Sequence, residues 1–475
     1  MSSLPDVSLA TSRSSRASFV LRTALSAALL LALVPGLLRY AGTSYVSGDT
    51  WFLVRQVREM VDHVGRGEWH TWLAHFALLQ HLPAAVLVVA GLSDGHVYEG
   101  LVLLNLVVLA AVSVFAWWQL RRRSPVIAVI FLAVVLSGTI LWYGHASFSE
   151  LLAAALTLAM VVGLLDGAAT PWIVLPLVGA AIAKDTSLPF VLILGLGTAF
   201  AAGRPQASWY QRLRLGPLAL GGLLGAALVA GWNYLSFGLF FNPGNFNPQF
   251  FVPTLGIQVR FFLGIWLSPN GGVIPFWPTL SALLALALLA AVVDLRRAAT
   301  WQERLVLVVP LAAVTVVLGG VSLGLSKWLA PMGWYAWGSR LMQPWLPAAA
   351  YLLAWSYADR ISALIFAIRR YPLAILLPLG LAAATLPQYL VLFRGNLGDA
   401  IFLPGKTCPV LATIDNPDYY YQCAVHQLWS PHPVLLDAYQ PNLDVVAFAL
   451  AALCCLAWFW FTVRGVLAAT RAAHQ

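Results

Sequence analysis

One carboxylate stands where the first long apolar run of the chain ends. Asp49 lies in SYVSGDTWFLVRQV (residues 44–57), and no basic residue lies within five positions of it. A carboxylate at the end of a membrane span can take a proton from a hydroxyl as a general base, or bind a divalent cation. A helix cap or a plain interfacial charge is the alternative interpretation of Asp49.

Two basic residues have the chemistry needed to bind a phosphate. Lys184 separates two short apolar runs in AAIAKDTSLPF (180–190), and Arg340 lies in SKWLAPMGWYAWGSRLMQPWLP (326–347). An ammonium group binds phosphate as a point charge, and a guanidinium group can clamp two phosphate oxygens. For Lys184, a tight turn marked by a Lys–Asp pair is the equally weighted alternative.

Aromatic side chains cluster just before Arg340. Trp334, Tyr335 and Trp337 could bind the apolar faces of a sugar, although any membrane interface carries such an aromatic belt. In LWYGHASFSELL (141–152), His145 and Glu150 could help to position a substrate, and a capped turn is the alternative.

These residues must be positioned by membrane helices. The chain has 475 residues, 60% of them hydrophobic and 9% charged, whereas about 25% charged residues is usual for a soluble protein. Its apolar runs are near the length that crosses a bilayer, so the sequence predicts an all-α polytopic membrane protein. The net charge of +9 does not indicate nucleic acid binding, because the basic residues are spread among short loops.

About twelve spans are predicted, at 19–39, 97–119, 125–142, 151–165, 171–184, 186–202, 217–237, 273–293, 305–325, 341–357, 372–392 and 443–463.

Charge predicts the orientation of these spans. With both termini in the cytoplasm, most arginines fall inside, and most acids, the three lysines and eight of the nine histidines fall outside. This distribution fits the positive-inside rule. The predicted organisation is a cytoplasmic tail (1–18), one transmembrane domain (19–463) with long outer loops at 40–96, 238–272 and 393–442, and a second cytoplasmic tail (464–475). Chemistry is therefore expected on the outer face.

The first outer loop is expected to contain helices. In WFLVRQVREMVDHV (51–64), apolar residues recur at helical spacing opposite charged ones, which predicts an amphipathic helix on the membrane surface. The run HLPAAVLVVAGL (81–92) is too short to span and predicts a second interfacial or re-entrant helix. In the last outer loop, Cys408 and Cys423 could form a disulfide, because an oxidising compartment permits one. Two free thiols are the alternative.

Four stretches resemble the GT-C superfamily of integral-membrane glycosyltransferases. In chain order they are SGDTWFLVRQVREMVDHVG, HLPAAVLVVAGLSDGHVYEGLVLLNL, FLGIWLSPNGGVIPFWPTL and MGWYAWGSRLMQPWLP. Members commonly carry two adjacent acids in the first outer loop, whereas this chain has Gly48-Asp49-Thr50. That departure leaves metal dependence open: Mg²⁺ or Mn²⁺ is possible, and no metal ligand can be named.

The resemblance implies an inverting glycosyltransferase in a bacterial inner membrane. The donor would be a polyprenyl-phosphate-linked sugar, and the acceptor a hydroxyl on a glycan, lipid or protein outside the bilayer. Asp49 would be the general base, and Lys184, Arg340, Arg58 and Arg260 would neutralise the leaving phosphate. A transporter or flippase is the main alternative. A ligase that moves whole glycans and a non-catalytic assembly partner are two more.

Overall fold

The computed structural model describes most of the central part of the chain. The described residues are 48–67, 77–143, 149–184, 186–202, 215–243, 251–298, 300–332, 339–368, 385 and 417–430. Within these ranges the chain is almost entirely helical, and its β pairing is an isolated antiparallel bridge between Phe251 and Trp328. The spans predicted at 19–39 and 443–463, and all of 372–392 except residue 385, lie outside these ranges. The count of twelve spans stays a prediction.

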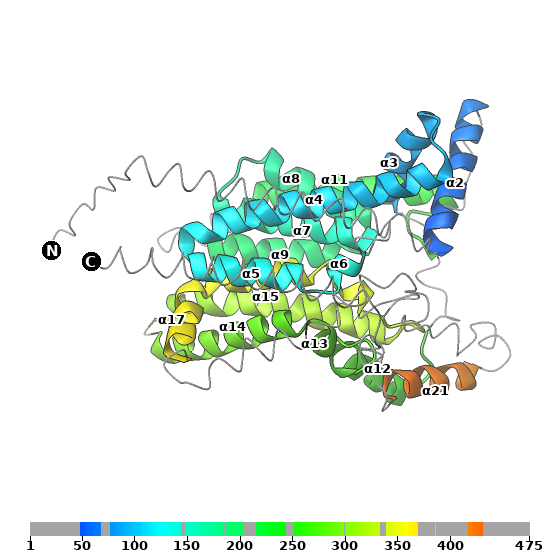
Figure 1. Ribbon diagram of the computed structural model, residues 1–475. Helices are drawn as coiled ribbons and strands as arrows, with labels where there is room; N and C mark the ends of the chain where they lie inside the picture. The colour runs from blue at the N-terminus through cyan, green and yellow to red at the C-terminus, as the bar shows by residue number, and fades with distance from the viewer. Residues whose placement is uncertain are drawn as a thin grey trace, which may run out of the picture.

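Nine helices of the described chain form an elongated bundle (Figure 1). They are α4 (Asp94–Arg123), α5 (Pro125–Leu136), α7 (Ser149–Asp166), α8 (Pro171–Ala183), α9 (Leu188–Ala202), α11 (Leu215–Phe237), α14 (Pro278–Arg297), α15 (Trp301–Ser326) and α16 (Leu346–Ser356). Five of them, α4, α7, α11, α14 and α15, are long and apolar enough to cross a membrane. This is what a membrane-embedded protein requires.

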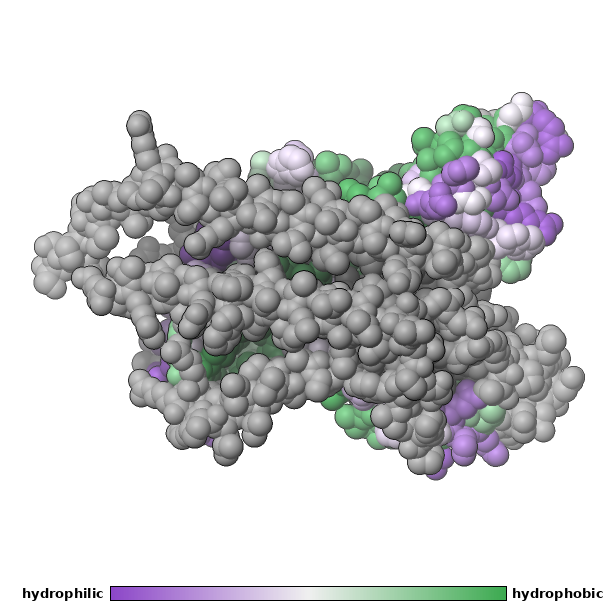
Figure 2. Space-filling model, in the orientation of Figure 1, coloured by the Kyte–Doolittle hydropathy of each residue, from purple (hydrophilic) through white to green (hydrophobic). Residues whose placement is uncertain are grey.

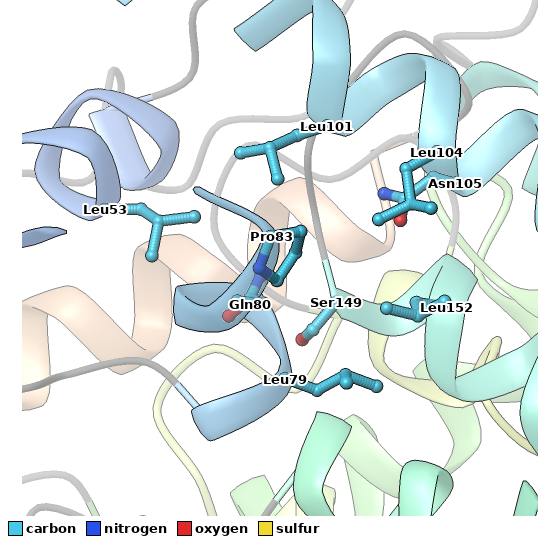
Figure 3. A pocket seen from close by; sticks show the side chains of 9 residues that line it. All are labelled: Leu53, Leu79, Gln80, Pro83, Leu101, Leu104, Asn105, Ser149 and Leu152. Carbon is cyan, nitrogen blue, oxygen red and sulfur yellow. The ribbon is translucent and has the colours of Figure 1, made fainter. Parts of the chain in front are cut away.

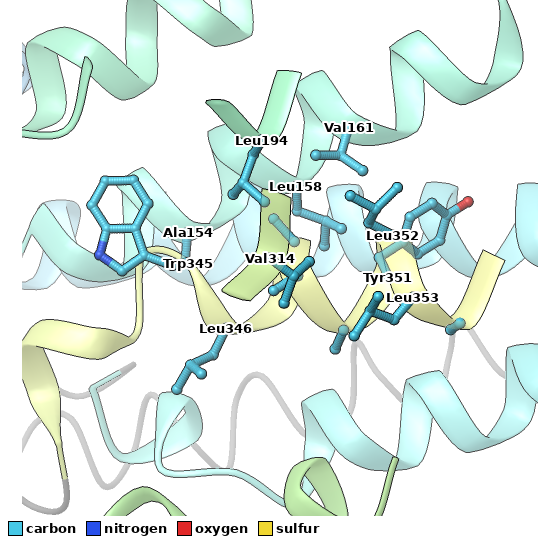
Figure 4. Packing of buried hydrophobic residues seen from close by; sticks show 14 of the residues in the cluster. Ala154, Leu158, Val161, Leu194, Val314, Trp345, Leu346, Tyr351, Leu352 and Leu353 are labelled. Atoms are coloured by element: carbon cyan, nitrogen blue, oxygen red, sulfur yellow. The ribbon is translucent and has the colours of Figure 1, made fainter. Parts of the chain in front are cut away.

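Helix α7 is the centre of the bundle. Its apolar residues surround the whole helix, and nearly all are buried against α4, α8, α9 and α16. Figure 4 shows Leu158 of α7 packed among Leu194, Val314 and Leu352, which come from three other helices. A helix that is apolar on all sides is stable only when protein or lipid covers it, so α7 fixes the positions of its neighbours.

Three predicted spans are interrupted near one end of the bundle. The span at 125–142 is α5 followed, after Ser137–Thr139, by the short helix α6 (Ile140–Tyr143). The span at 273–293 is α13 (Val273–Phe276) and then α14, and the span at 341–357 is the 3₁₀ turn η3 (Arg340–Met342) and then α16. Trp277 stabilises the interruption between α5 and α6, because its Nε1 donates to Val134 O at 2.7 Å. A Cβ on Gly138 would lie 2.0 Å from the Trp277 ring, so only glycine fits at that position.

The two ends of the bundle differ in composition. The basic end is defined by the C-terminal turns of α4 and α14, which carry Arg121–Arg123 and Arg296–Arg297. Helix α17 (Ala358–Ile368) lies there, tied to α14 by Arg360 Nε, which donates to Asp294 Oδ1 at 2.5 Å. Trp172 and Trp301 are 69% and 68% exposed at this end, as expected of interfacial tryptophans.

Helices that do not belong to the nine of the bundle lie at its other end, which we call the opposite end. Among them are α2 (Gly48–Gly65), α3 (Leu78–Val89), α12 (Leu255–Leu267) and α21 (Pro417–Leu428). The sequence predicts the first two, whereas α12 and α21 occupy stretches expected to be outer loop. Helix α2 runs across the bundle axis in Figure 1 and buries Leu53, Val54 and Val57 against α3 and α4. Its polar side faces outward beside apolar residues in Figure 2.

Candidate functional site

Three charged side chains from distant parts of the chain meet at the opposite end. Lys184 Nζ lies 3.3 Å from Glu150 Oε1, and Arg340 Nε lies 3.4 Å from the same oxygen. Glu150 is in the first turn of α7, Lys184 caps the C-terminus of α8, and Arg340 opens η3. We call these three residues the Glu150 cluster. The sequence analysis predicted Lys184 and Arg340 as phosphate ligands and Glu150 as a substrate contact, and the structure brings the three together.

The Glu150 cluster lies largely inside the protein. The side chains of Glu150, Arg340 and Lys184 are 5%, 9% and 22% exposed. Both cations lie against the same carboxylate oxygen. Lysine and arginine side chains are also the usual ligands of phosphate groups. Lys184, the most exposed of the three, is the cation that an anion can reach most easily.

Two hydrogen-bonded neighbours hold Arg340 in place. Ser339 Oγ lies 2.9 Å from both Ile265 O and Gly271 O, and Gln343 Nε2 donates to Thr139 Oγ1 at 2.8 Å. Ser339 and Gln343 flank η3 on either side, and both are buried. The turn that carries Arg340 is therefore fixed at both ends to separate parts of the fold. Gln343 was not predicted as a site residue.

A small pocket lies beside the Glu150 cluster, between α2, α3, α4 and α7. Its polar lining is Gln80, Asn105 and Ser149, the residue before Glu150, and leucines and Pro83 complete it (Figure 3). It holds about 10 Å³, which is about the room of one water molecule. Leu53 of α2 also lines it. Asp49 lies in the first turn of α2, four residues before Leu53.

The remaining predicted cations lie apart from this cluster. Arg58 Nε donates to Asp94 Oδ1 at 2.5 Å, and its Nη2 donates to Leu92 O at 2.9 Å. Arg58 therefore ties α2 to the start of α4. Arg260 is exposed on α12. Neither residue has a described contact with Glu150.

Several predicted residues fall where the structure gives no description. His145, Trp334, Tyr335 and Trp337 lie outside the described residues, and so does Cys408. Cys423, in α21, is disulfide-bonded. Its pairing with Cys408 stays a prediction. Among the residues that the structure describes, no three His, Cys, Asp or Glu side chains gather as a metal site would require.

A buried histidine that the sequence analysis did not single out lies in α3. His81 is 2% exposed, its Nδ1 lies 3.1 Å from Ala77 O, and its ring lies 4.8 Å from that of Trp232 in α11. Burial lowers the pKa of His81 to about 4, although the hydrogen bond to Ala77 opposes the shift. His81 is thus neutral at pH 7 and joins α3 to α11.

Comparison with known proteins identifies no relative. No family model, no curated protein and no solved structure matches this chain. The function must therefore be argued from the chain itself.

Proposed function

We propose that the protein is a membrane glycosyltransferase that takes a sugar from a polyprenyl-phosphate donor and transfers it to a hydroxyl acceptor. One observation supports this most: a buried arginine and a half-buried lysine lie against the same carboxylate, at the end of the bundle where α2 carries Asp49. A lipid phosphate is an anion that lysine and arginine can bind, and its apolar tail can remain in the bilayer.

The residues have distinct roles in the proposed reaction. Asp49 takes the proton of the acceptor hydroxyl as the acceptor oxygen attacks the anomeric carbon of the sugar. The bond between that carbon and the phosphate oxygen breaks, and the phosphate leaves with the bonding electrons and with inversion at carbon. Lys184 and Arg340 stabilise the negative charge that collects on the leaving phosphate. Glu150 holds both cations in place before the donor arrives.

The position of α2 also supports the role of Asp49. Leu53, one turn along α2, lines the same pocket as Ser149, the neighbour of Glu150. The backbone thus puts the start of α2 near the cluster. The orientation that follows has the basic end in the cytoplasm of a bacterium and the Glu150 cluster at the outer face of its inner membrane.

Sugar transfer by reconstituted protein tests the proposal. Full-length protein in vesicles is incubated with a panel of radiolabelled polyprenyl-phosphate sugars and a membrane extract as acceptor source. Asp49→Asn is expected to lose at least 100-fold in transfer rate, in line with the usual contribution of a general base. Asp62→Asn is the matched control, because Asp62 is an exposed carboxylate on the same helix. Equal loss in both variants, or no loss in Asp49→Asn, would remove Asp49 from the reaction.

A transporter or flippase is the second candidate. Ionisable groups buried in a membrane bundle often line a transport route, and the Glu150 cluster is such a group. The same vesicles separate the two functions. A transferase makes a covalent product from the labelled sugar, whereas a flippase moves the intact donor between leaflets without cleaving it.

A further inference from the structure

Helix α12 exposes an unbroken apolar stripe at the opposite end of the bundle. Leu255, Val259, Leu263 and Leu267 recur every four residues along it, and all four are exposed, Leu255 by 73%. The buried face of α12 is formed by Phe261, Gly264 and Ile265. Phe261 packs with Tyr421 of α21 in a small core of its own. An exposed apolar stripe of this kind normally marks an interaction surface.

Two hydrogen bonds fix the direction of α12 relative to α15. Near its C-terminal end, Trp266 Nε1 donates to Ser322 Oγ at 3.0 Å. Just before its N-terminus, Val252 N donates to Lys327 O at 2.8 Å. The 13 residues of α12 extend over ~20 Å, whereas Ser322 and Lys327 are ~8 Å apart along the axis of α15. Helix α12 therefore crosses α15 at a steep angle.

The level at which α12 meets α15 matches a membrane surface. Trp301, exposed at the basic end, begins α15, and Ser322 lies ~32 Å further along that helix. This separation is about the thickness of the hydrocarbon core of a bilayer, ~30 Å. If the tryptophans of the basic end mark one interface, α12 lies at the other.

Helix α15, which α12 contacts, also exposes apolar residues. Val316 and Leu323 of α15 are 54% and 55% exposed, and α15 is one of the helices able to cross a membrane. Arg260 is exposed at the edge of the stripe on α12. An apolar stripe with a basic residue at its edge is the pattern of a helix that lies in the headgroup region.

We propose that α12 is a membrane-surface helix, with Val259 and Leu263 inserted into the acyl boundary of the outer leaflet and Arg260 at the level of the lipid phosphates. The stretch 238–272 is then not a plain outer loop. This proposal does not depend on the enzymatic activity, since it rests on the stripe, the crossing direction and the level of α12 alone.

Collision measurements on nitroxide labels test the proposal directly. Full-length protein with Val259→Cys or Leu263→Cys is labelled and reconstituted in vesicles of phosphatidylethanolamine and phosphatidylglycerol, and the unsubstituted chain gives the background from its native cysteines. Val316→Cys is the lipid-facing control and Asp62→Cys the water-facing control. The ratio of collisions with oxygen to collisions with a water-soluble nickel chelate reports depth. At 259 and 263 this ratio is expected to be several-fold above that of Asp62→Cys and close to that of Val316→Cys.

The other outcomes overturn the proposal. A ratio equal to that of Asp62→Cys means that α12 lies in water. Few collisions with either reagent mean that protein, such as a second copy of this chain, covers the stripe. A label at Arg260→Cys adds a gradient, because its ratio is expected to fall between those of Leu263→Cys and Asp62→Cys.

Discussion

Both ends of the bundle carry exposed ion pairs, but the most buried pair that the structure describes, Arg340 with Glu150, lies at the opposite end. At the basic end, Arg122 lies 3.8 Å from Asp166, with the arginine side chain 60% exposed. Arg123 lies 3.8 Å from Asp359, which is 84% exposed. At the opposite end, the side chains of Arg340 and Glu150 are only 9% and 5% exposed.

Burial separates ion pairs that add little to stability from a cluster that could do chemistry. Exposed pairs contribute little to stability, because water and salt screen them. A buried cluster of charges is costly to build, and such sites are often functional. The comparison therefore favours the opposite end as the place of the candidate site.

The largest effect is expected from neutralising Glu150. Glu150→Gln removes the carboxylate against which Lys184 and Arg340 lie, and removal of one partner of a buried pair usually costs about 3–5 kcal/mol. Thermal unfolding in detergent, followed by tryptophan fluorescence, measures the loss. Asp166→Asn at the basic end is the matched control and should change little. Similar melting temperatures for the two variants would remove the contrast between the ends.

The second largest effect is expected from acid, which should lower the stability of the fold through His81. An unfolded histidine titrates near pH 6.5, whereas the pKa of folded His81 is about 4, so the unfolded state binds more protons between these values. The contribution of neutral His81 is complete above pH 6.5 and declines as the pH falls, by on the order of 3 kcal/mol once the pH is below 4. Unfolding measured from pH 7.5 to 4 should show this decline. His81→Gln should flatten the profile in that window, and an equally steep profile in the variant would contradict the assignment.

A smaller effect is expected from substituting Gln343, which follows the turn that carries Arg340. Gln343→Leu removes the hydrogen bond to Thr139 but keeps the volume, so about 1 kcal/mol of stability is expected to be lost. If Gln343 positions Arg340, its effect should be non-additive with that of Arg340→Lys. A double-mutant cycle on unfolding free energies measures this coupling. Strict additivity would mean that Gln343 supports the fold without positioning Arg340.

The smallest effect is expected at the basic end. Arg122→Gln breaks the exposed pair with Asp166 and should change the unfolding free energy by less than about 0.5 kcal/mol. Thermal unfolding checks this value. A loss comparable to that of Glu150→Gln would mean that exposure does not decide what an ion pair contributes here.

The sequence predicted the helices better than their interruptions. Long apolar runs are direct evidence of spans, and α4, α7 and α11 begin and end within a few residues of their predicted bounds. The break at Ser137–Thr139 was missed, although Ser, Gly and Thr together favour a turn. Helix α12 was missed because its stripe repeats every four residues in a stretch too short to be counted as a span.

The sequence grouped Lys184 and Arg340 as phosphate ligands, but it gave Glu150 a role in substrate binding and did not predict that the three residues meet. Glu150 and Lys184 are 34 positions apart, and Arg340 follows much later, so no local spacing reports their contact. Only tertiary packing brings them together. Gln343 and His81 were missed for the same reason, because burial gives a single glutamine or histidine its role and the sequence alone does not reveal it.

Binding of a sugar-free polyprenyl phosphate tests the central claim most directly. Affinity is measured in lipid nanodiscs for the wild type, for Lys184→Met and for Arg122→Met. Lys184 is the most exposed member of the Glu150 cluster, so its loss should disturb the fold least. The account predicts at least tenfold weaker binding for Lys184→Met and unchanged binding for Arg122→Met. Equal affinity in all three proteins would contradict it.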